Sequence, residues 1–293
     1  MPDDVLPWRR RPPRRVATRT FLSPAVRAAV AARGVDVTSL QGSGLDGRVT
    51  RDDVARMRDE VVPLNNVQRR AGAHLLRSSR IAAQAFVAIE VDFEDVDVVR
   101  RVTRLTFLPF VARAVVDAIT RHPWVNATVD DDGYATASDR VHLGIAVDLS
   151  HEGLVVPVVR DAQDRRLVAL AHDVADIARR ARAKQLSPDD VTGGTFTITN
   201  PGPAGTAVSV PIINQPQVAI LSTDGVARRP VVVQTASGRD TIDTRATGVL
   251  GLSFDHRVVD VAYAAAFLRD VRDVLETRDW FVEASLPRSV SSR

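Results

Sequence analysis

The sequence has no cysteine and only one lysine, Lys184, among its 293 residues. The absence of cysteine excludes disulfide bonds, thiolate metal sites and a cysteine nucleophile, and it fits the cytoplasmic location that we expect. No stretch of about 18 consecutive apolar residues occurs, and the first residues lack the apolar core of a signal peptide. We therefore expect no metal and no membrane association.

The chain also has little excess of positive over negative charge, since its net charge is only +3. The basic excess is concentrated in two short arginine runs at 9–11 and 14–15, within a proline-rich stretch. Such a stretch is typical of a solvated, flexible arm, and it lacks the interleaved aromatic residues of a nucleic-acid site. We predict an arm over 1–19 and no nucleic-acid partner.

Patterning divides the rest of the chain into segments of different kinds. Residues 20–57 read as a compact helical unit in which Ser23 and Pro24 begin a helix and Thr50 begins another. Residues 58–62 read as a linker, 63–286 as one large domain and 287–293 as a polar tail. The hydrophobic content of 45% is ample for a core of that size.

A glycine-rich loop at 42–47 spells G-x-G-x-x-G, the spacing of a dinucleotide-binding turn. That interpretation requires a preceding strand and a surrounding strand–helix–strand unit, and the sequence predicts neither. We interpret the loop as the connection within a two-helix unit.

The large domain alternates between helical and strand-like periodicity. The patterns predict helices at 66–83, 105–122, 167–183, 187–190 and 260–277, and strands at 85–91, 141–147, 154–159, 195–199, 218–221, 230–234 and 247–254. Neighbouring strands without a helix between them favour a mixed sheet over a doubly wound parallel sheet. The expected fold class is α/β.

The most informative run is 253–260, which closes a strand-like segment and opens a helical one. A histidine at such a corner, His256, is held rigidly, and histidine is the side chain best suited to move a proton near neutral pH. Asp260 follows about one helical turn later. The spacing alone leaves two interpretations open, a catalytic pair or a corner histidine followed by a helix-capping aspartate.

Ordered segments across the chain resemble one known family. The small unit resembles the peripheral subunit-binding domain of dihydrolipoamide acyltransferases through the residues at 23–27, 34–36, 42–44, 47–50 and 53–54. The large domain resembles the catalytic domain of the same family through the runs at 122–127, 143–148, 153–158, 193–202, 212–217 and 253–260. These segments span about 20–282 in the family's order.

The resemblance implies a chloramphenicol-acetyltransferase-like sandwich of helices over a large mixed sheet, in a homotrimer or larger homo-oligomer with active sites between subunits. It implies that His256 is the general base, which takes a proton from a thiol or hydroxyl that attacks acyl-CoA. The Thr199 hydroxyl would donate to the tetrahedral oxyanion, and it would face His256 across the reaction centre. Asp260 matches the family aspartate and would organise the corner.

In the small unit, Arg27 and Arg48 match basic residues that contact acidic partner subunits. A third basic position falls on Ala31, so we expect weak binding to a dehydrogenase subunit.

The chain departs from the family pattern in three further ways. The sequence shows no lipoyl domain before the small unit, and Lys184 lies in a helical segment, so we expect no lipoyl group on this chain. Val261 replaces a family glycine and adds bulk beside the corner. Residues 280–282 match an apolar C-terminal segment that joins family trimers into larger cores, but a polar tail follows them.

Three functions fit these observations. The missing lipoyl domain and Val261 favour an acyltransferase that moves an acetyl or other acyl group from acyl-CoA to a hydroxyl of a small-molecule or carrier-bound acceptor, as in tetronate assembly. The alternative is the acyltransferase core of a 2-oxo acid dehydrogenase complex acting on dihydrolipoamide, with the lipoyl domain supplied by another chain. A non-catalytic scaffold is the third, although it has no need of His256 and Thr199.

Overall fold

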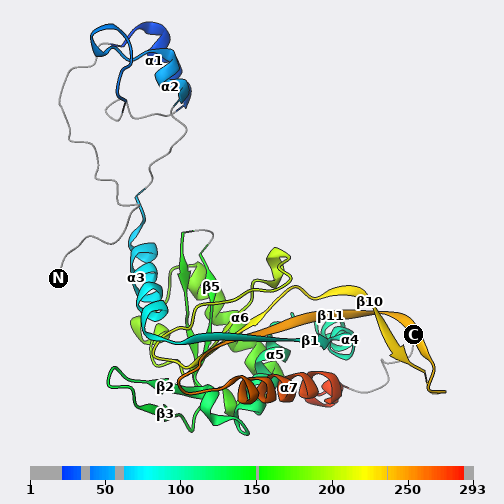
Figure 1. Ribbon diagram of the computed structural model, residues 1–293. Coiled ribbons are helices and arrows are strands. Elements are labelled where there is room, and N and C mark those ends of the chain that lie inside the picture. Colours follow the sequence, from blue (N-terminus) through cyan, green and yellow to red (C-terminus); the bar gives the residue numbers. More distant parts are fainter. Residues whose placement is uncertain (1–21, 34–39, 57–62, 150–151, 236, 287–293) are drawn as a thin grey trace. The chain divides into compact units, whose positions relative to one another are not determined.

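The computed structural model describes residues 22–33, 40–56, 63–149, 152–235 and 237–286 (Figure 1). The arm expected at 1–19, the linker at 58–62 and the tail at 287–293 lie outside the described residues. The contacts divide the chain into two units, Met1–Pro63 and Leu64–Arg293. The domain boundaries expected from the sequence stay predictions.

The small unit contains two short helices, α1 (Pro24–Arg33) and α2 (Arg51–Arg56), with the 3-10 turn η2 (Leu45–Gly47) between them. Its core consists of four buried valines: Val26, Val30, Val49 and Val54. A core this small gains little from burial alone, so polar contacts in the connecting loop also matter.

Asp53 supplies those contacts by binding the glycine-rich loop to α2. Its carboxylate accepts hydrogen bonds from the backbone N–H groups of Ser43 (2.9 Å) and Thr50 (2.8 Å), and the Ser43 hydroxyl lies 2.5 Å away. A Cβ on Gly42 would come within 2.3 Å of the Gly47 carbonyl oxygen, so the two strands of the loop meet too closely for a side chain. The loop therefore connects the two helices of a helical unit, as predicted, and Gly42 allows its close approach.

The large unit is built on a mixed seven-stranded sheet in the order β1-β11-β9-β8-β4-β7, with β10 paired to β11. The strands are β1 (Gln84–Asp92), β4 (Leu143–Ile145), β7 (Val158–Val159), β8 (Phe196–Thr199), β9 (Ala219–Thr223), β10 (Ala227–Gln234) and β11 (Asp240–Asp255). The pairs β4–β8 and β8–β9 are parallel, and the other pairs are antiparallel. The mixed sheet expected from the sequence is confirmed.

Alternation along β11 gives the sheet two different faces. Leu250, Leu252 and Phe254 belong to the hydrophobic core, whereas Gly251 and Ser253 point to the opposite face. The first half of β11, up to Thr247, pairs with β10 instead, and there both strands are largely exposed. A single long strand therefore links the core of the sheet to an exposed hairpin.

Helices cover the apolar face of the sheet (Figure 1). They are α4 (Glu94–Thr103), α5 (Leu108–Ile119), α6 (Leu167–Arg182), α7 (Val261–Thr277) and the short α8 (Trp280–Glu283). Nearly every residue of α5 is buried, and its two charged side chains, Arg113 and Asp117, form an ion pair one turn apart. The central helix can therefore lie inside the core without an isolated charge.

Trp280 corrects an expectation for the C-terminal apolar segment. Its side chain is 1% exposed, packs edge-on against Phe110 at 5.1 Å between ring centroids, and donates its indole N–H to the Leu275 carbonyl at 3.0 Å. Trp280 thus completes the core of its own chain and is not available to join trimers, whereas Val282 is 62% exposed.

The remaining elements extend this frame. Helix α3 (Asn66–Ile81) leads into β1 and begins with a capping box between Asn65 and Gln68. The short strand pairs are β2 (Ala127–Val129) with β3 (Ala135–Ala137), and β5 (Val147–Asp148) with β6 (Leu154–Val155); the 3-10 turns are η3 (Pro123–Asn126), η4 (Ala162–Asp164), η5 (Pro188–Val191) and η6 (Gly202–Ala204).

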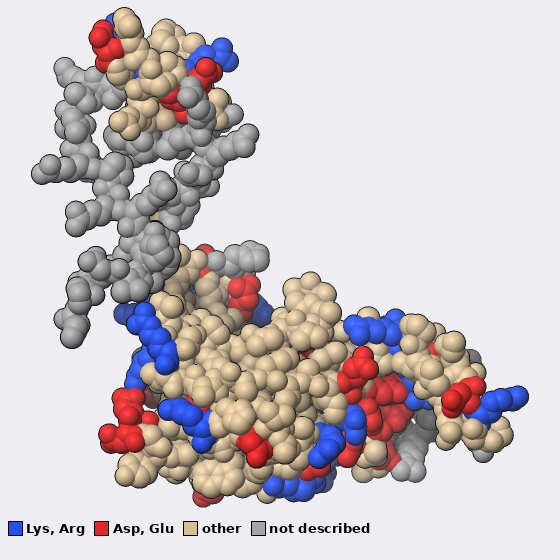
Figure 2. All heavy atoms as spheres, viewed as in Figure 1, with Lys and Arg blue, Asp and Glu red and all other residues tan. Residues whose placement is uncertain are grey.

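Arginines and carboxylates are interspersed on the face shown in Figure 2. Some pairs lie along one helix, such as Arg180 with Asp176 in α6, and others join two elements, such as Arg180 with Asp190 of η5. None of the helices in the described ranges has the length and hydropathy to cross a membrane.

Candidate active site

His256 lies in the turn between β11 and α7, and its backbone is fixed from two sides. Its N–H donates to the Ala83 carbonyl at 2.8 Å, just before β1 begins. The turn is closed by the N–H groups of Val258 and Val259, which both donate to the Asp255 carbonyl at 3.0 and 3.1 Å. The His256 side chain is exposed, with its ring 5.9 Å from that of the buried Phe254. A rigid backbone thus presents an accessible imidazole.

An ion pair next to His256 also shapes this turn. The Asp255 side chain is fully buried, and it accepts hydrogen bonds from the Arg257 Nε and Nη2 groups at 2.9 and 2.6 Å. The Arg257 N–H donates to the same carboxylate at 3.1 Å. Asp255 hydrogen-bonds the Arg257 guanidinium and so raises the pKa of Arg257 above its ordinary value. Neither residue was expected to have a role, although both flank His256 in the sequence.

Asp260 caps helix α7. Its Oδ1 accepts a hydrogen bond from the Tyr263 N–H at 2.7 Å, and its carbonyl accepts one from Ala264 at 3.0 Å. Within the described part of the chain, no hydrogen bond joins the Asp260 carboxylate to the His256 ring. This geometry agrees with the capping interpretation of the H-x-x-x-D spacing.

Val261 is the first residue of α7 and is 49% exposed. It is absent from the residues with positive φ, so a β-branched side chain fits the backbone here without strain. Its bulk therefore extends outward from the corner that carries His256.

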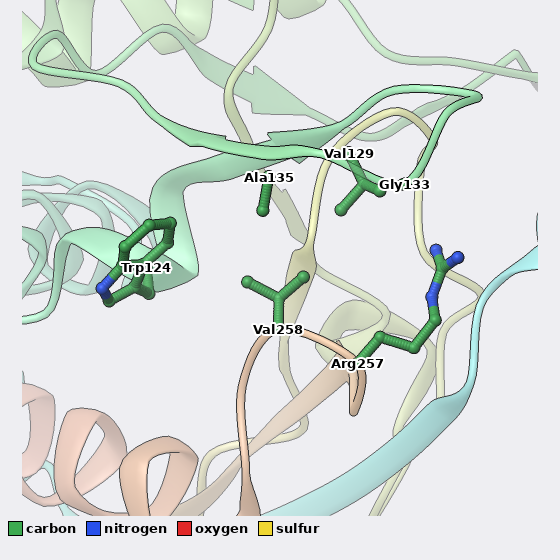
Figure 3. A pocket seen from close by; sticks show the side chains of 6 residues that line it. All are labelled: Trp124, Val129, Gly133, Ala135, Arg257 and Val258. Carbon is green, nitrogen blue, oxygen red and sulfur yellow. The ribbon is translucent and has the colours of Figure 1, made fainter.

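A cavity of about 290 Å³ adjoins the corner (Figure 3). Trp124, Val129, Ala135 and Val258 give it apolar lining, and Arg257 extends from the same turn as Val258. Trp124 is 44% exposed, although tryptophan is highly buried on average. The sequence signal for this lining was the tryptophan within the H-P-W-V-N run.

Thr199 is the last residue of β8 and is half-buried. Because Ile198 points into the core, Thr199 points to the face of the sheet opposite the helices. Its hydroxyl makes no hydrogen bond to any described residue. The side chain can therefore donate to a bound group, as the resemblance implies.

The sheet register separates Thr199 from His256 within one chain. Thr199 pairs with Ser222, and Ser222 pairs with Gly251, which precedes His256 by five residues along β11. Five residues correspond to about 17 Å along the strand, and the two strand spacings add about 10 Å across the sheet. One chain does not bring these two residues together, so they can face each other only across two copies of the chain.

The small unit presents its two predicted contact residues to solvent. Arg27 lies on α1 and Arg48 follows η2, and both side chains are exposed. Ala31, one turn after Arg27, is exposed as well, so the third family position lies on the same face but carries no charge.

Comparison with known families identifies both units. Residues 56–282 match the catalytic domain of the 2-oxoacid dehydrogenases acyltransferase family, and residues 20–55 match the e3 binding domain.

Two relatives show how far the likeness extends. The dihydrolipoyllysine-residue acetyltransferase component of the pyruvate dehydrogenase complex of Mycobacterium tuberculosis is 40% identical over 230 residues, which cover 78% of this chain and 41% of that protein. The lipoamide acyltransferase component of the branched-chain alpha-keto acid dehydrogenase complex of Pseudomonas aeruginosa is 33% identical over 305 residues, which cover 94% of this chain and 69% of that protein. The chain spans less than half the length of the first relative.

Solved structures share the fold of the large unit. The cubic core of a pyruvate dehydrogenase multienzyme complex superposes with a TM-score of 0.71 at 29% identity, covering 78% of this chain and 96% of that one. A dihydrolipoamide acetyltransferase from Azotobacter vinelandii, solved to examine one serine, one histidine and one asparagine in catalysis, gives a TM-score of 0.70 at 29% identity and covers 78% and 94%. This chain belongs to the 2-oxoacid dehydrogenase acyltransferase family, and its large unit is the catalytic domain of that family.

Proposed function

We propose that this chain is the acyltransferase core of a 2-oxo acid dehydrogenase complex and moves an acyl group between CoA and a dihydrolipoyl thiol. The observation that carries the proposal is the exposed His256 on a backbone-fixed corner, in a chain that belongs to this family. The names of the relatives specify dihydrolipoyllysine or lipoamide. The hydroxyl acceptor favoured from the sequence has no support from these relatives, so the thiol acceptor replaces it.

His256 acts as the general base in this proposal. Its imidazole takes the proton of the acceptor thiol, and the sulfur attacks the thioester carbonyl of acyl-CoA. The resulting oxyanion accepts a hydrogen bond from the Thr199 hydroxyl. When the intermediate collapses, the bond to the CoA sulfur breaks, and the protonated His256 returns its proton to that sulfur. The histidine and asparagine examined in the Azotobacter protein are four positions apart, as His256 and Asp260 are here.

The active site requires two copies of the chain. Because Thr199 and His256 lie at different ends of one sheet, a complete site forms where Thr199 of one copy approaches His256 of another. A trimer with sites between its subunits satisfies this requirement. The cubic core of the related complex is an assembly of the same domain, which supports a homo-oligomer.

Lys184 does not carry the dihydrolipoyl group that accepts the acyl group in this proposal. Lys184 follows helix α6, and its ammonium lies 2.5 Å from the Glu152 carboxylate. A lysine in this place is a poor carrier for a swinging lipoyl arm, so the dihydrolipoyl group is supplied by another segment or chain.

An acyl-transfer assay tests the acceptor. Acetyl-, isobutyryl- and succinyl-CoA are each incubated with dihydrolipoamide or with hydroxyl acceptors, and release of CoA is measured. We expect transfer to dihydrolipoamide and a loss of about 10²–10⁴-fold in kcat for His256→Ala, with an unchanged circular dichroism spectrum. Transfer to hydroxyls alone would contradict the thiol acceptor, and an unaffected His256→Ala rate would contradict the general base.

Mixing two inactive variants tests the shared site. Chains carrying His256→Ala and chains carrying Thr199→Ala are co-expressed with different tags, and mixed oligomers are isolated. Sites that combine His256 of one chain with Thr199 of the other are intact, so activity should reappear in the mixture. If the site lay within one chain, every site would carry one defect and the mixture would stay as inactive as its parents.

The small unit is proposed to bind a dehydrogenase subunit through Arg27 and Arg48. Calorimetric titration with a dihydrolipoamide dehydrogenase should show binding that weakens with salt and with the double change of both arginines to alanine. Ala31→Arg should restore the third positive charge and tighten binding by about two- to fivefold. Equal affinity for all three proteins would contradict an arginine-based contact.

A further inference from the structure

Asp224 follows strand β9 and is almost completely buried, with 2% of its surface exposed. Its Oδ1 accepts hydrogen bonds from the hydroxyls of Thr206 and Ser209, both at 2.7 Å. Its Oδ2 accepts one from the Ser209 N–H at 3.1 Å and lies 3.3 Å from the Ser222 hydroxyl. No ion pair to Asp224 occurs within the described ranges. Hydrogen bonds from hydroxyl and amide donors therefore offset the cost of burying this carboxylate.

Thr206 and Ser209 belong to the segment 200–210, which directly follows Thr199. The backbone of the segment also touches Asp224 and its neighbour: Gly225 donates its N–H to the Thr206 carbonyl at 2.8 Å. A Cβ on Gly202 would come within 2.8 Å of the Asp224 carbonyl oxygen, so the chain approaches too closely there for a side chain. The segment is thus held against Asp224 both near its start and in its second half.

Ser222 connects this arrangement to Thr199. The two residues are paired neighbours in β8 and β9 and point to the same face of the sheet. The Ser222 hydroxyl lies 3.0 Å from the Ser209 carbonyl oxygen, so its single hydrogen is used within the Asp224 contacts. No hydrogen bond joins the Ser222 and Thr199 hydroxyls in the described ranges, so the Thr199 hydroxyl keeps its hydrogen for a bound group.

We propose that Asp224 is a positioning residue: it holds segment 200–210 in place and thereby sets the orientation of Thr199 for the oxyanion. The inference rests on the proposed function for the role of Thr199. Asp224 touches neither substrate nor reacting atoms, so its effect on the reaction passes through the segment and Thr199. Asp224 itself carries no feature in the sequence that predicts this role.

Hydrogen exchange and kinetics test this role together. Asp224→Ala should speed amide exchange in peptides that cover 199–210, with no change in peptides from β11. It should lower kcat about 10–100-fold while the KM for acetyl-CoA changes less than about threefold. The reason is that a misplaced Thr199 hydroxyl loses its hydrogen bond mainly in the transition state. Gly202→Ala should reproduce both effects through the backbone.

Two comparisons separate positioning from general damage. Asp224→Asn keeps one acceptor for the Ser209 amide, while the Thr206 and Ser209 hydroxyls can turn to accept from its NH₂ group, so it should recover most of the rate. Asp53→Asn removes a similarly bonded carboxylate from the small unit and should leave transfer to free dihydrolipoamide unchanged. A double-mutant cycle with Thr199→Ala completes the test. Adding Asp224→Ala to the Thr199→Ala chain should lower kcat less than about threefold.

The outcomes are distinct. Unchanged exchange over 199–210 in Asp224→Ala would overturn the proposal, and this measurement needs no enzyme activity. Faster exchange with an unchanged kcat, or a full additional loss in the Thr199→Ala background, would overturn it as well. A wild-type chain that transfers no acyl group would instead refute the proposed function, while the exchange at Thr199 would still decide whether Asp224 holds this segment.

Discussion

The Arg257 guanidinium and the Asp255 carboxylate form an ion pair across the turn that carries His256, with Nη2 and Oδ2 separated by 2.6 Å. The Asp255 side chain is fully buried, whereas 43% of the Arg257 side chain is exposed. This pair holds the corner from the solvent side, while the Ala83 carbonyl holds it from β1.

Removing Arg257 should therefore affect both stability and rate. Arg257→Ala leaves a buried carboxylate without its partner and should lower the free energy of unfolding by about 2–3 kcal/mol. It should lower kcat at least about tenfold, because His256 loses its fixed position. Arg257→Lys keeps the charge but not the forked geometry of the guanidinium. Its stability and its kcat should therefore lie between those of the wild type and those of Arg257→Ala. Urea denaturation and initial rates measure both effects, with the exposed Arg179→Ala as control, which should change stability by less than about 1 kcal/mol.

Asp260 variants distinguish a helix cap from a catalytic group. Asp260→Ala should lower stability by about 1 kcal/mol, because the Tyr263 N–H loses its acceptor. Asp260→Ser keeps a capping oxygen without a carboxylate, so it should retain both the stability and the turnover of the wild type. A serine variant that folds normally but loses activity would show that the carboxylate itself takes part in the reaction.

Trp280 and Val282 should respond differently to substitution. Trp280→Ala creates a cavity beside Phe110 and should cost about 3–5 kcal/mol of stability. Val282→Asp changes an exposed side chain and should alter stability by less than about 0.5 kcal/mol. Thermal unfolding and light scattering give stability and oligomer mass for both. A stable Trp280→Ala chain with a smaller oligomer would show that Trp280 joins subunits after all.

The small unit should be sensitive to acid through Asp53. Hydrogen bonds from Ser43 and Thr50 hold the pKa of the Asp53 carboxyl well below its usual range. A carboxyl with a lowered folded-state pKa stabilises the fold above about pH 4, and this stabilisation is lost as the pH falls toward the lowered value. The protection factors of the amides at 42–50, which correct exchange rates for their intrinsic pH dependence, should therefore fall between pH 5 and pH 2. In Asp53→Asn the same amides should be less protected at pH 5, and their protection should depend less on pH. Identical pH profiles of protection in the wild type and in Asp53→Asn would contradict this prediction.

Periodicity predicted most of the fold. Helices α3, α5, α6 and α7 and strands β1, β8, β9 and β10 occur within a few residues of their expected positions, because their apolar spacing is regular. The strands expected at 141–147 and 154–159 each divide into two short strands of different sheets, and the helix expected at 187–190 is the 3-10 turn η5. Helix α4 was not expected, although acidic residues open it and Arg100 and Arg101 close it. Strand β11 is much longer than predicted, since its exposed first half is fixed by pairing with β10 rather than by an apolar pattern.

The sequence alone determined the family, the mixed sheet and the corner at His256, because these depend on local order and on short runs of residues. The tertiary structure decided which residues far apart in the sequence are neighbours in space. Trp280 turned out to belong to the core, Asp260 to cap a helix and Asp224 to hold the segment after Thr199. The pairing of strands far apart in the sequence puts Thr199 and His256 at a distance from each other within one chain, which supports the site between subunits that the family resemblance implies.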